Sequence, residues 1–514
     1  MAWWSPAPVK LGDVLSQTPL ESGRLPPTRC RGGENRQGPQ ALAKGQAGLV
    51  LAAVWRRSKR SRSAHNENVE PPVTDQAQAE ASAVDPGIVS GSVRIPLTAW
   101  LEEVQLHTDL AKDVEEKFGS VPQQAENVVN DVVMRIQSGA QRCVAPSATA
   151  HPFGSTVNGF GEVTSDLDVL VAIDEQELQY YMSYANFQQR YQRGDPLLHD
   201  DAARESLVPS VMLQTVNAKH AMSHAVQQLA DFLPELGFKV SQLIPRARKP
   251  LVTLEDTQSS LTEVDVSINN SLPLYNSELL RSYSKLDPRV RPLVLLVKVW
   301  AKGKKVCGAH EGNLSSYSWT IMVLYFLQLA GVLPSLQLLS KEERQIETRD
   351  YWSKVRTFEV GFRKLEDYQK DVADGRVPAP EGEASASLAH LLYGFMRFFS
   401  KEYGWGKEVV SIHKPDRMDR GVWWPFFGKN QPEPCIHVED PIEFRDLNIV
   451  MRRERLAQLK VEFEHALNML TEGCSLEELL SCEPQPDVMI VPRRRPRGRR
   501  KFKSIPLPRL PEFK

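Results

Sequence analysis

The chain has 514 residues, 25% of them charged, with a formal net charge of −1, and is long enough for two or three globular domains. Its six cysteines form neither a C-x-x-C pair nor a Cys/His cluster. This pattern excludes a zinc module and a disulfide scaffold and favours a reducing compartment. No apolar run approaches the ~20 residues of a membrane helix, so we expect no membrane partner.

Residues 1–90 are rich in Pro, Gly, Gln, Ser and Arg, and among residues 1–64 only Asp13, Glu21 and Glu34 are acidic. Such a composition is typical of an organellar transit peptide, and it fits a disordered RNA-binding or nuclear-targeting arm about as well. We predict a disordered basic arm or transit segment over residues 1–90. The expected location is cytoplasmic or nuclear, with organellar import as the alternative.

Residues 91–145 change to a helical pattern. Apolar residues recur at helical spacing over residues 100–110 and again over residues 128–136. We predict N-terminal helices here that pack on a helical domain further along the chain.

The stretch 151–171 carries the first candidate site. Asp166 and Asp168 are two residues apart and lead into an apolar run, so on a strand both carboxylates leave the sheet on one face. Ahead of them, Gly154 and Ser155 make a turn at which backbone N–H groups and a hydroxyl can approach a phosphate closely. Two carboxylates facing such a turn are what a pair of divalent ions bridging a triphosphate would need.

A third carboxylate, Asp265, lies on the polar face of a strand whose other face carries Val264 and Val266. A neighbouring strand could bring Asp265 beside the first two aspartates. We predict that residues 146–272 form a small mixed sheet with helices on one face. The inserted residues 175–215 have no functional interpretation.

Residues 273–475 are predicted to form a helical domain. One helix continues through residues 290–300 and carries Lys298 and Lys302 four residues apart on one face. Like charges at this spacing destabilise an isolated helix by roughly 0.2–0.5 kcal/mol. Because the helix is otherwise nearly all apolar, we expect it to be buried and its lysines to need anions.

A second, very apolar helix begins at Ser315 or Ser316 and ends at Gly331. Its N-terminus presents hydroxyl and free N–H groups, which is typical of an anion site. Tyr317, in the first turn, is placed where its ring could stack on a base. Residues 335–386 follow, and we predict an insertion with a disordered part.

The last segments are an aromatic-rich helix at residues 387–403, an acidic segment at residues 436–448 and a charged helix at residues 449–470. A basic tail is predicted over residues 476–514, where eight of the eleven residues Arg493–Lys503 are basic. Such a run is usually solvated or a targeting signal, and it could also bind RNA phosphates in a salt-sensitive way.

The order of these motifs resembles the nucleotidyltransferase superfamily that includes DNA polymerase β: Gly-Ser, a ten-residue gap, Asp-Leu-Asp and a later Val-Asp-Val. More closely, residues 146 to about 470 resemble the terminal uridylyltransferases and the related cytoplasmic and organellar poly(A) polymerases. The resemblance implies an α+β fold, in which a small mixed-sheet nucleotidyltransferase domain packs on a helical poly(A)-polymerase central domain. It also implies a template-independent enzyme that adds AMP or UMP residues from NTP to RNA 3′ ends.

The resemblance implies roles for individual residues. Asp166, Asp168 and Asp265 would be the ligands of two Mg²⁺ ions, with Mn²⁺ as the alternative metal. Asp265 would also be the candidate base for the RNA 3′-hydroxyl. The implied nucleotide-binding residues are Gly154, Ser155, Asn276, Lys298, Lys302, Ser316, Tyr317, Asp440, Glu443 and Asp446.

The choice of base depends on the acidic segment. Asp440 and Glu443 take the places that lie against the base edge in the uridylyltransferases, and Asp446 stands where some uracil-specific members have a histidine. An acidic side chain can accept from the adenine amino group or, through water, from uracil N3–H. The missing histidine gives a slight preference for ATP over UTP. The implied partners are an RNA 3′ end and an NTP.

Two other functions were considered for a chain with these motifs. A non-catalytic RNA-binding scaffold with the same fold would require a damaged acidic set, whereas all three aspartates are present. An oligoadenylate or tRNA-end enzyme of the same superfamily is disfavoured by the Glu-Asp-Pro segment at residues 439–441 and by the Lys298/Lys302 pair.

Overall fold

The computed structural model describes residues 94–178 except 175, 218–349 except 248, 260, 262 and 342, 355–378, 386–420 except 415, and 436–486 except 449 and 452. Within those residues, no helix combines the length and the apolar character needed to cross a membrane. The predicted arm at residues 1–90, nearly all of the insertion at residues 175–215 and the basic run at residues 493–503 lie outside the described residues.

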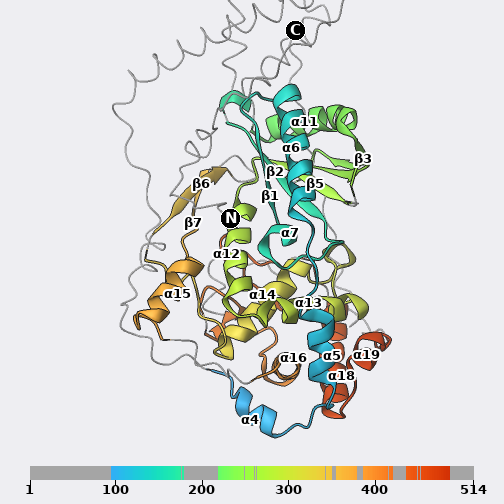
Figure 1. Cartoon of the computed structure of the whole chain (residues 1–514), viewed down its shortest axis with the longest axis vertical. Coiled ribbons are helices and arrows are strands. Elements are labelled where there is room, and N and C mark those ends of the chain that lie inside the picture. The colour runs from blue at the N-terminus through green and yellow to red at the C-terminus, as the bar shows by residue number, and fades with distance from the viewer. Residues whose placement is uncertain are drawn as a thin grey trace, which may run out of the picture.

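Five strands form one mixed sheet in the order β1-β2-β5-β4-β3 (Figure 1). β2 and β5 run parallel, and every other neighbouring pair is antiparallel. In β5 the only residue that is not buried is Asp265, and in β2 Asp168 is one of two partly exposed residues. The strands are β1 (Thr149–Phe153), β2 (Leu167–Ala172), β3 (Phe238–Ile244), β4 (Leu251–Asp256) and β5 (Val264–Ile268).

Two helices, α6 (Glu126–Cys143) and α11 (Ala218–Phe232), pack on this sheet and on each other. Their apolar residues share one hydrophobic core with the strands, as the sequence pattern predicts. The structure differs from the predicted grouping of residues 91–145, because α6 belongs to this core and not to the helical part. Arg135 of α6 donates to both carboxylate oxygens of Asp256, at 2.9 and 2.8 Å, and so joins α6 to the end of β4. We call this part the sheet lobe.

A second, larger core belongs to the helices, which we call the helical lobe. At its centre the rings of Trp300, Trp319 and Phe463 pack together with centroids 5.4–5.9 Å apart. The predicted α+β class, with a mixed sheet joined to a helical part, is confirmed. The helices are α4 (Leu97–Glu102), α5 (Leu110–Phe118), α12 (Leu272–Leu286), α13 (Val290–Gly303), α14 (Ser316–Leu329), α16 (Leu388–Arg397), α18 (Arg453–Thr471) and α19 (Leu476–Ser481).

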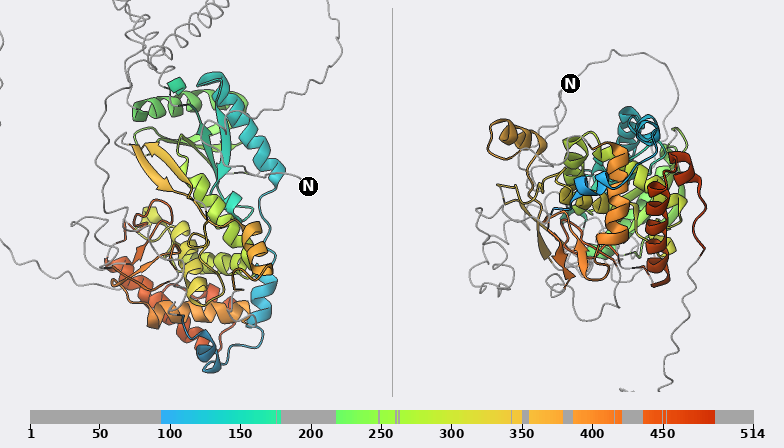
Figure 2. Two further views of the ribbon diagram at one scale, coloured as in Figure 1. Left: turned by 90° about the vertical axis from the view of Figure 1, so that its left-hand side faces the viewer. Right: turned by 90° about the horizontal axis from the view of Figure 1, so that it is seen from below.

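The predicted insertion at residues 335–386 contains an ordered hairpin, β6 (Gln345–Arg349) and β7 (Val355–Glu359), and a helix, α15 (Leu365–Ala373). The hairpin lies beside α12 (Figure 2). A third, small core joins it to the start of α12 and to the acidic segment through Val360, Leu272 and Ile442. The acidic segment at residues 436–448 contains β10 (His437–Val438), which pairs in a three-stranded sheet with β8 (Glu408–Val410), itself paired with β9 (Met418–Asp419).

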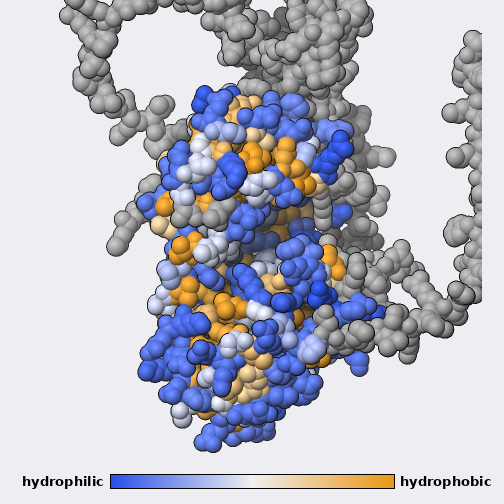
Figure 3. Space-filling model, turned by 90° about the vertical axis from the view of Figure 1, so that its right-hand side faces the viewer, coloured by the Kyte–Doolittle hydropathy of each residue, from blue (hydrophilic) through white to orange (hydrophobic). Residues whose placement is uncertain are grey.

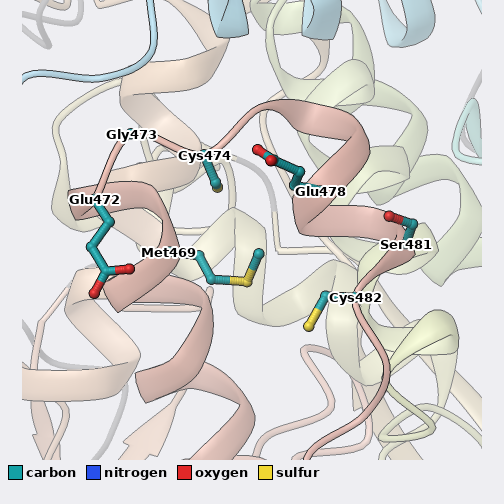
Figure 4. Close-up of a pocket in the computed structure, with 7 residues that line it drawn as sticks. All are labelled: Met469, Glu472, Gly473, Cys474, Glu478, Ser481 and Cys482. Atoms are coloured by element: carbon teal, nitrogen blue, oxygen red, sulfur yellow. The ribbon is translucent and has the colours of Figure 1, made fainter.

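The predicted basic tail begins within ordered structure, because α19 occupies residues 476–481. Ser475 caps this helix in a capping box with Glu478. A pocket at the turn between α18 and α19 is lined by Met469, Cys474 and Cys482, among others (Figure 4). Burial raises the pKa of the Cys474 thiol to about 11. The thiol is therefore protonated at neutral pH, and we assign this pocket no chemistry.

Candidate active site

Asp168 and Asp265 lie at the same level of the two parallel strands at the centre of the sheet. They are Cα partners in the β2–β5 register, and both side chains are partly buried. Asp166 is exposed and lies one residue before β2, so it enters the same region from the end of the strand. The predicted convergence of Asp265 with the first two aspartates is therefore present in the structure.

Mutual repulsion of these carboxylates shows in their electrostatics. Burial, followed by the negative charges of Asp265, Asp166 and Glu263, raises the pKa of Asp168 to about 7. Burial also raises the pKa of Asp265, with Asp166 adding to the shift. Glu263 is a fourth acid that the motif search missed, and its pKa is raised mainly by Asp166.

Thr253 of β4 is a further residue of the site that sequence reasoning missed. It is the Cα partner of Asp265 across the β4–β5 pair. Its hydroxyl donates to Asp265 Oδ1 at 2.7 Å, and this bond lowers the pKa of Asp265 against the effect of burial. One oxygen of the Asp265 carboxylate is thus fixed, and the other is left for a ligand.

The Gly154–Ser155 turn lies directly against Asp168. Gly154 has a φ of +76°, and a Cβ at this position would collide with the Asp168 carboxylate. The turn leads into the short helix α7 (Ser155–Asn158). Ser277 of α12 accepts a hydrogen bond from the Gly154 N–H at 2.8 Å, so the helical lobe holds the turn in place.

The cations of α13 bind the loop between α7 and β2. Arg291 donates to the carbonyls of Gly159 and Gly161, and Lys298 donates to the Phe160 carbonyl at 2.9 Å. Burial, and next the charge of Lys302, lowers the pKa of Lys298. The buried lysine therefore has a carbonyl partner where we expected only an anion, although an ammonium keeps two further donors. Lys302 is exposed.

Tyr317, the predicted base-stacking residue, lies in the first turn of α14. Ser315, not Ser316, is the N-cap, and its hydroxyl accepts from the Ser318 N–H at 3.1 Å. Ser316 Oγ lies 3.5 Å from Cys307 Sγ. The Tyr317 hydroxyl is buried and has no hydrogen-bond partner among the described residues. Its pKa is raised well above the usual value by burial and next by Asp440.

Asp440 and Glu443 lie in a tight turn, and their negative charges raise the pKa of the Tyr317 hydroxyl. The Asp440 N–H donates to the Arg445 carbonyl at 2.8 Å, and Asp440 Oδ1 accepts from the N–H groups of Ile442 and Glu443. Arg445 completes the cluster, with its guanidinium 3.1 Å from Glu443 and 3.7 Å from Asp440. The motif search did not single out this arginine.

Asp446 lies differently from its predicted place at the base edge. Its side chain is only 1% exposed, and Oδ2 lies 2.7 Å from His437 Nδ1. Oδ1 accepts from the N–H groups of Val438 and Asn448. Both oxygens are therefore used inside the protein, and Asp446 as it lies here offers neither of them to a nucleobase.

Asn276 of α12 lies next to Ser277, and both side chains are buried. Its Oδ1 has no hydrogen-bond partner among the described residues. A buried amide oxygen without a partner is costly. This is consistent with the predicted contact to a nucleotide, which stays a prediction.

The acids suit a hard divalent cation, because they supply only carboxylate oxygens and raise one another's pKa values. Among the described residues, no three His, Cys, Asp or Glu side chains already stand in the arrangement of a metal site. The role of Asp166, Asp168 and Asp265 as metal ligands therefore stays a prediction.

The surface between the lobes is hollowed on the face drawn in Figure 3. The Gly154 turn belongs to the sheet lobe, where α7 packs against α12, whereas the α13 cations and the first turn of α14 belong to the helical lobe. The candidate residues for metal, phosphate and base therefore come from both lobes.

Two family models match the chain. The first, described as the central palm domain of mitochondrial-like poly(A) RNA polymerase, matches residues 110–285, and so includes α6 with the sheet. The second, described as Cid1 family poly A polymerase, matches residues 387–445 and includes the Asp440 turn.

Curated relatives include poly(A) RNA polymerases that match about three quarters of the chain. The poly(A) RNA polymerase GLD2 of Homo sapiens is 26% identical over 397 residues, which are 74% of this chain and 69% of that protein. GLD2-B of Xenopus laevis is 26% identical over 72% of this chain, which spans only 62% of that relative's length. The terminal uridylyltransferase cid1 of Schizosaccharomyces pombe is 36% identical over 200 residues, 37% of this chain and 44% of that protein.

A solved structure of a cytoplasmic RNA terminal U-transferase is similar over 74% of this chain and 100% of its own, with 25% identity and a TM-score of 0.52. A structure of Cid1 with its short product ApU shares the fold at 24% identity and a TM-score of 0.52. These matches support the assignment of residues 110–285 and 387–445 to the nucleotidyltransferase family that is represented by the poly(A) RNA polymerases and the Cid1 terminal uridylyltransferase.

Proposed function

We propose that this protein is a template-independent RNA nucleotidyltransferase that adds AMP or UMP residues from NTP to RNA 3′ ends. The observation that carries the proposal is the register of Asp168 with Asp265 against the Gly154 turn. Clustered carboxylates beside a phosphate-sized turn suit the transfer of a nucleotidyl group, in which charge on the phosphate must be neutralised.

The acids have distinct roles in this proposal. Asp166, Asp168 and Asp265 would hold two Mg²⁺ ions, which would supply charge neutralisation and activation of the attacking and leaving oxygens. Asp265 is the candidate acceptor for the proton of the RNA 3′-hydroxyl. Thr253 fixes one of its oxygens, so the carboxylate does not need to reorient before it accepts that proton.

The nucleotide is bound by residues of both lobes. The backbone of Gly154 and the Ser155 hydroxyl would contact the triphosphate, with Lys298 and Lys302 supplying positive charge. Asn276 would contact the nucleotide, Ser316 would contact its phosphates, and the Tyr317 ring would stack on the base. Asp440 and Glu443 would lie at the base edge, and their effect on the pKa of the Tyr317 hydroxyl supports this assignment.

The relatives support both bases, since GLD2 is named a poly(A) RNA polymerase and cid1 a terminal uridylyltransferase. The slight preference for ATP rests on the missing uracil-marking histidine. Asp446, which stands at that position, is buried against His437 and adds no contact to either base. A non-catalytic scaffold is disfavoured because the three aspartates are intact and two of them are in register.

The test uses purified full-length protein, Mg²⁺, a labelled RNA with a free 3′ end and each NTP in turn. The proposal expects the RNA to lengthen with ATP or UTP and not with an RNA whose 3′-hydroxyl is blocked. RNA that binds but never lengthens with any NTP would favour the scaffold interpretation.

A further inference from the structure

One cross-strand row of side chains continues from the acids to the edge strand β3. Asp168 is the Cα partner of Asp265, and Asp265 is the partner of Thr253. Thr253 in turn is the partner of Gln242, which is exposed on β3, the last strand of the sheet (Figure 1). Partners in adjacent strands leave the sheet on the same face. Gln242 therefore shares the face that carries the acids, opposite the core of the sheet lobe.

A β-bulge in β3 brings Gln242 to this face. Val240 pairs with Leu254, whose side chain belongs to the core of the sheet lobe. The register then shifts, so that Gln242 pairs with Thr253 although it lies two residues after Val240. In a regular ladder Ser241 would pair with Thr253, and Gln242 would point to the core face. The extra residue thus turns a long side chain that both donates and accepts hydrogen bonds to the face of the acids.

The Gly154 turn indicates on which side of the acids the triphosphate would bind. Gly154 follows Phe153, which is the Cα partner of Asp168 on the β1 side of the row. α12 packs on β1 and α7, and Ser277 of this helix accepts from the Gly154 N–H. In the proposed reaction the triphosphate would therefore lie over β1 and β2, and pyrophosphate would leave on that side.

The RNA 3′ end would approach from the opposite side. In nucleotidyl transfer the RNA 3′ oxygen forms its bond to the α-phosphorus as the bond to pyrophosphate breaks, with the attacking and leaving oxygens roughly in line. Asp265 would take the proton of the 3′-hydroxyl, so the last nucleotide of the RNA would lie over β4 and β3. The Thr253 hydroxyl already donates to Asp265 Oδ1. Gln242 is the next polar side chain along the row.

We propose that Gln242 binds the 2′-hydroxyl of the 3′-terminal ribose and thereby makes the protein prefer an RNA end over a DNA end. Adjacent strands lie about 4.8 Å apart, so Gln242 is roughly 10 Å from Asp265 across β4. A ribose that presents its 3′-hydroxyl to Asp265 carries the 2′-hydroxyl on the neighbouring carbon, and the long side chain of Gln242 can reach it over Thr253. The 2′-hydroxyl both donates and accepts, as the Gln242 amide does. This inference relies on the proposed function, whose RNA end it specifies.

The experiment uses the full chain, Mg²⁺ and three otherwise identical oligonucleotides with a free 3′-hydroxyl. The first is all ribose, the second lacks the 2′-hydroxyl of the last nucleotide, and the third lacks the 2′-hydroxyl of the nucleotide before it. A 3′-deoxy NTP limits the reaction to one addition, and kcat/KM is measured for each oligonucleotide. A neutral hydrogen bond changes affinity by about twofold to tenfold, so wild type should lose that factor on the second oligonucleotide and not on the third.

Gln242→Leu keeps a side chain of similar size and removes both hydrogen-bonding groups. It should lose the same factor on the all-ribose RNA and no longer distinguish the first two oligonucleotides. Gln227→Leu is the matched control, because Gln227 is also exposed but lies on α11, which packs on the core face of the sheet. It should keep the rates and the discrimination of wild type.

Three results would overturn the inference. A merely structural role of Gln242 would lower kcat/KM for the first two oligonucleotides equally in Gln242→Leu and leave their ratio as in wild type. A wild type that does not distinguish these two oligonucleotides would exclude a contact to the terminal 2′-hydroxyl. A wild type that is slower on the third oligonucleotide alone would place the contact at a different nucleotide.

Failure of the proposed function has a different signature. If wild type extends none of the three oligonucleotides with any NTP, the proposed function is wrong, and fluorescence anisotropy with the same oligonucleotides then tests Gln242 alone. Tighter binding of the all-ribose RNA than of the second oligonucleotide, lost in Gln242→Leu, would still support the inference. Equal binding of these two by wild type would contradict it.

Discussion

Asp168 and Asp265 are in-register partners on adjacent parallel strands, although the insertion at residues 175–215, α11, β3 and β4 all stand between them along the chain. The parallel pairing fixes which residues share a level, so it fixes the spacing of the two carboxylates without help from a loop. Their proximity has a cost, which appears as the raised pKa of Asp168. Costly clustering of acids on rigid strands is typical of a functional site.

Thr253 should matter for activity more than for folding. Thr253→Val removes the hydroxyl that holds Asp265 Oδ1, and we expect kcat/KM for nucleotide addition to fall about tenfold, the worth of a hydrogen bond to a charged group. Thr253→Ser should restore most of the activity. Thr357→Val on the exposed face of β7 is the control and should have no effect. Full activity in Thr253→Val would show that Asp265 needs no support.

Gly154 should tolerate no side chain. Gly154→Ala combines the strain of a φ of +76° with a collision against the Asp168 carboxylate, so we expect loss of nucleotide addition and a lower unfolding midpoint. Gly375→Ala is a close control, because Gly375 has a φ of +68° and no atom within 4 Å of a Cβ. It should show the conformational cost alone, about 1 kcal/mol, with normal activity. Equal activity in both variants would rule out the close approach to Asp168 as functional.

Asp446 should contribute to stability and not to base choice. Asp446→Ala leaves His437 and two backbone N–H groups without their acceptor, so the free energy of unfolding should fall by about 1–3 kcal/mol or more. Chemical denaturation measures this loss. For Asp446→His, which restores the histidine of some uracil-specific relatives, we expect the same instability. A stable Asp446→His protein with an altered UTP/ATP ratio would contradict the structure of this turn.

His413 should make the protein sensitive to mild acid. Burial lowers the pKa of His413 from 6.5 to about 4. Between these two pH values the imidazole is protonated in the unfolded chain and neutral in the folded protein. His413 therefore has no effect on the pH dependence of the free energy of unfolding above pH 6.5. Below pH 6.5 that free energy falls, by up to about 3 kcal/mol as the pH approaches 4.

His413→Phe keeps a ring against Phe444 and has no proton to gain. Urea unfolding from pH 7 to pH 4 should therefore show a steeper loss of stability in wild type than in this variant. Parallel curves for the two proteins would mean that the pKa of His413 is the same in the folded and the unfolded protein.

The sequence was informative where function constrains residue type. The two-residue spacing of Asp166 and Asp168 and the apolar run after them predicted a strand edge with acids, because strand side chains alternate. The Val-Asp-Val pattern predicted the strand of Asp265 in the same way. The long apolar helices were equally clear, because burial leaves a pattern in every turn.

The sequence was silent where partners are set by register and packing. Thr253 is hydrogen-bonded to Asp265, and Ser277 to Gly154. The sequence around a threonine or a serine does not indicate which residue its hydroxyl will contact. α6 has the same periodicity whether its apolar stripe faces the sheet or the helices. Asp446 was assigned to the base from its place in a motif, whereas its direction depends on His437 in the preceding strand.

The most direct test of the central claim is nucleotide addition by the Asp166→Ala/Asp168→Ala protein, measured with labelled RNA and the NTP that wild type uses. Its unfolding midpoint should be at least as high as that of metal-free wild type, because the substitution removes repulsion among the acids. The account predicts a folded protein that adds no nucleotide. A folded variant that still lengthens RNA would show that these acids are not the catalytic centre.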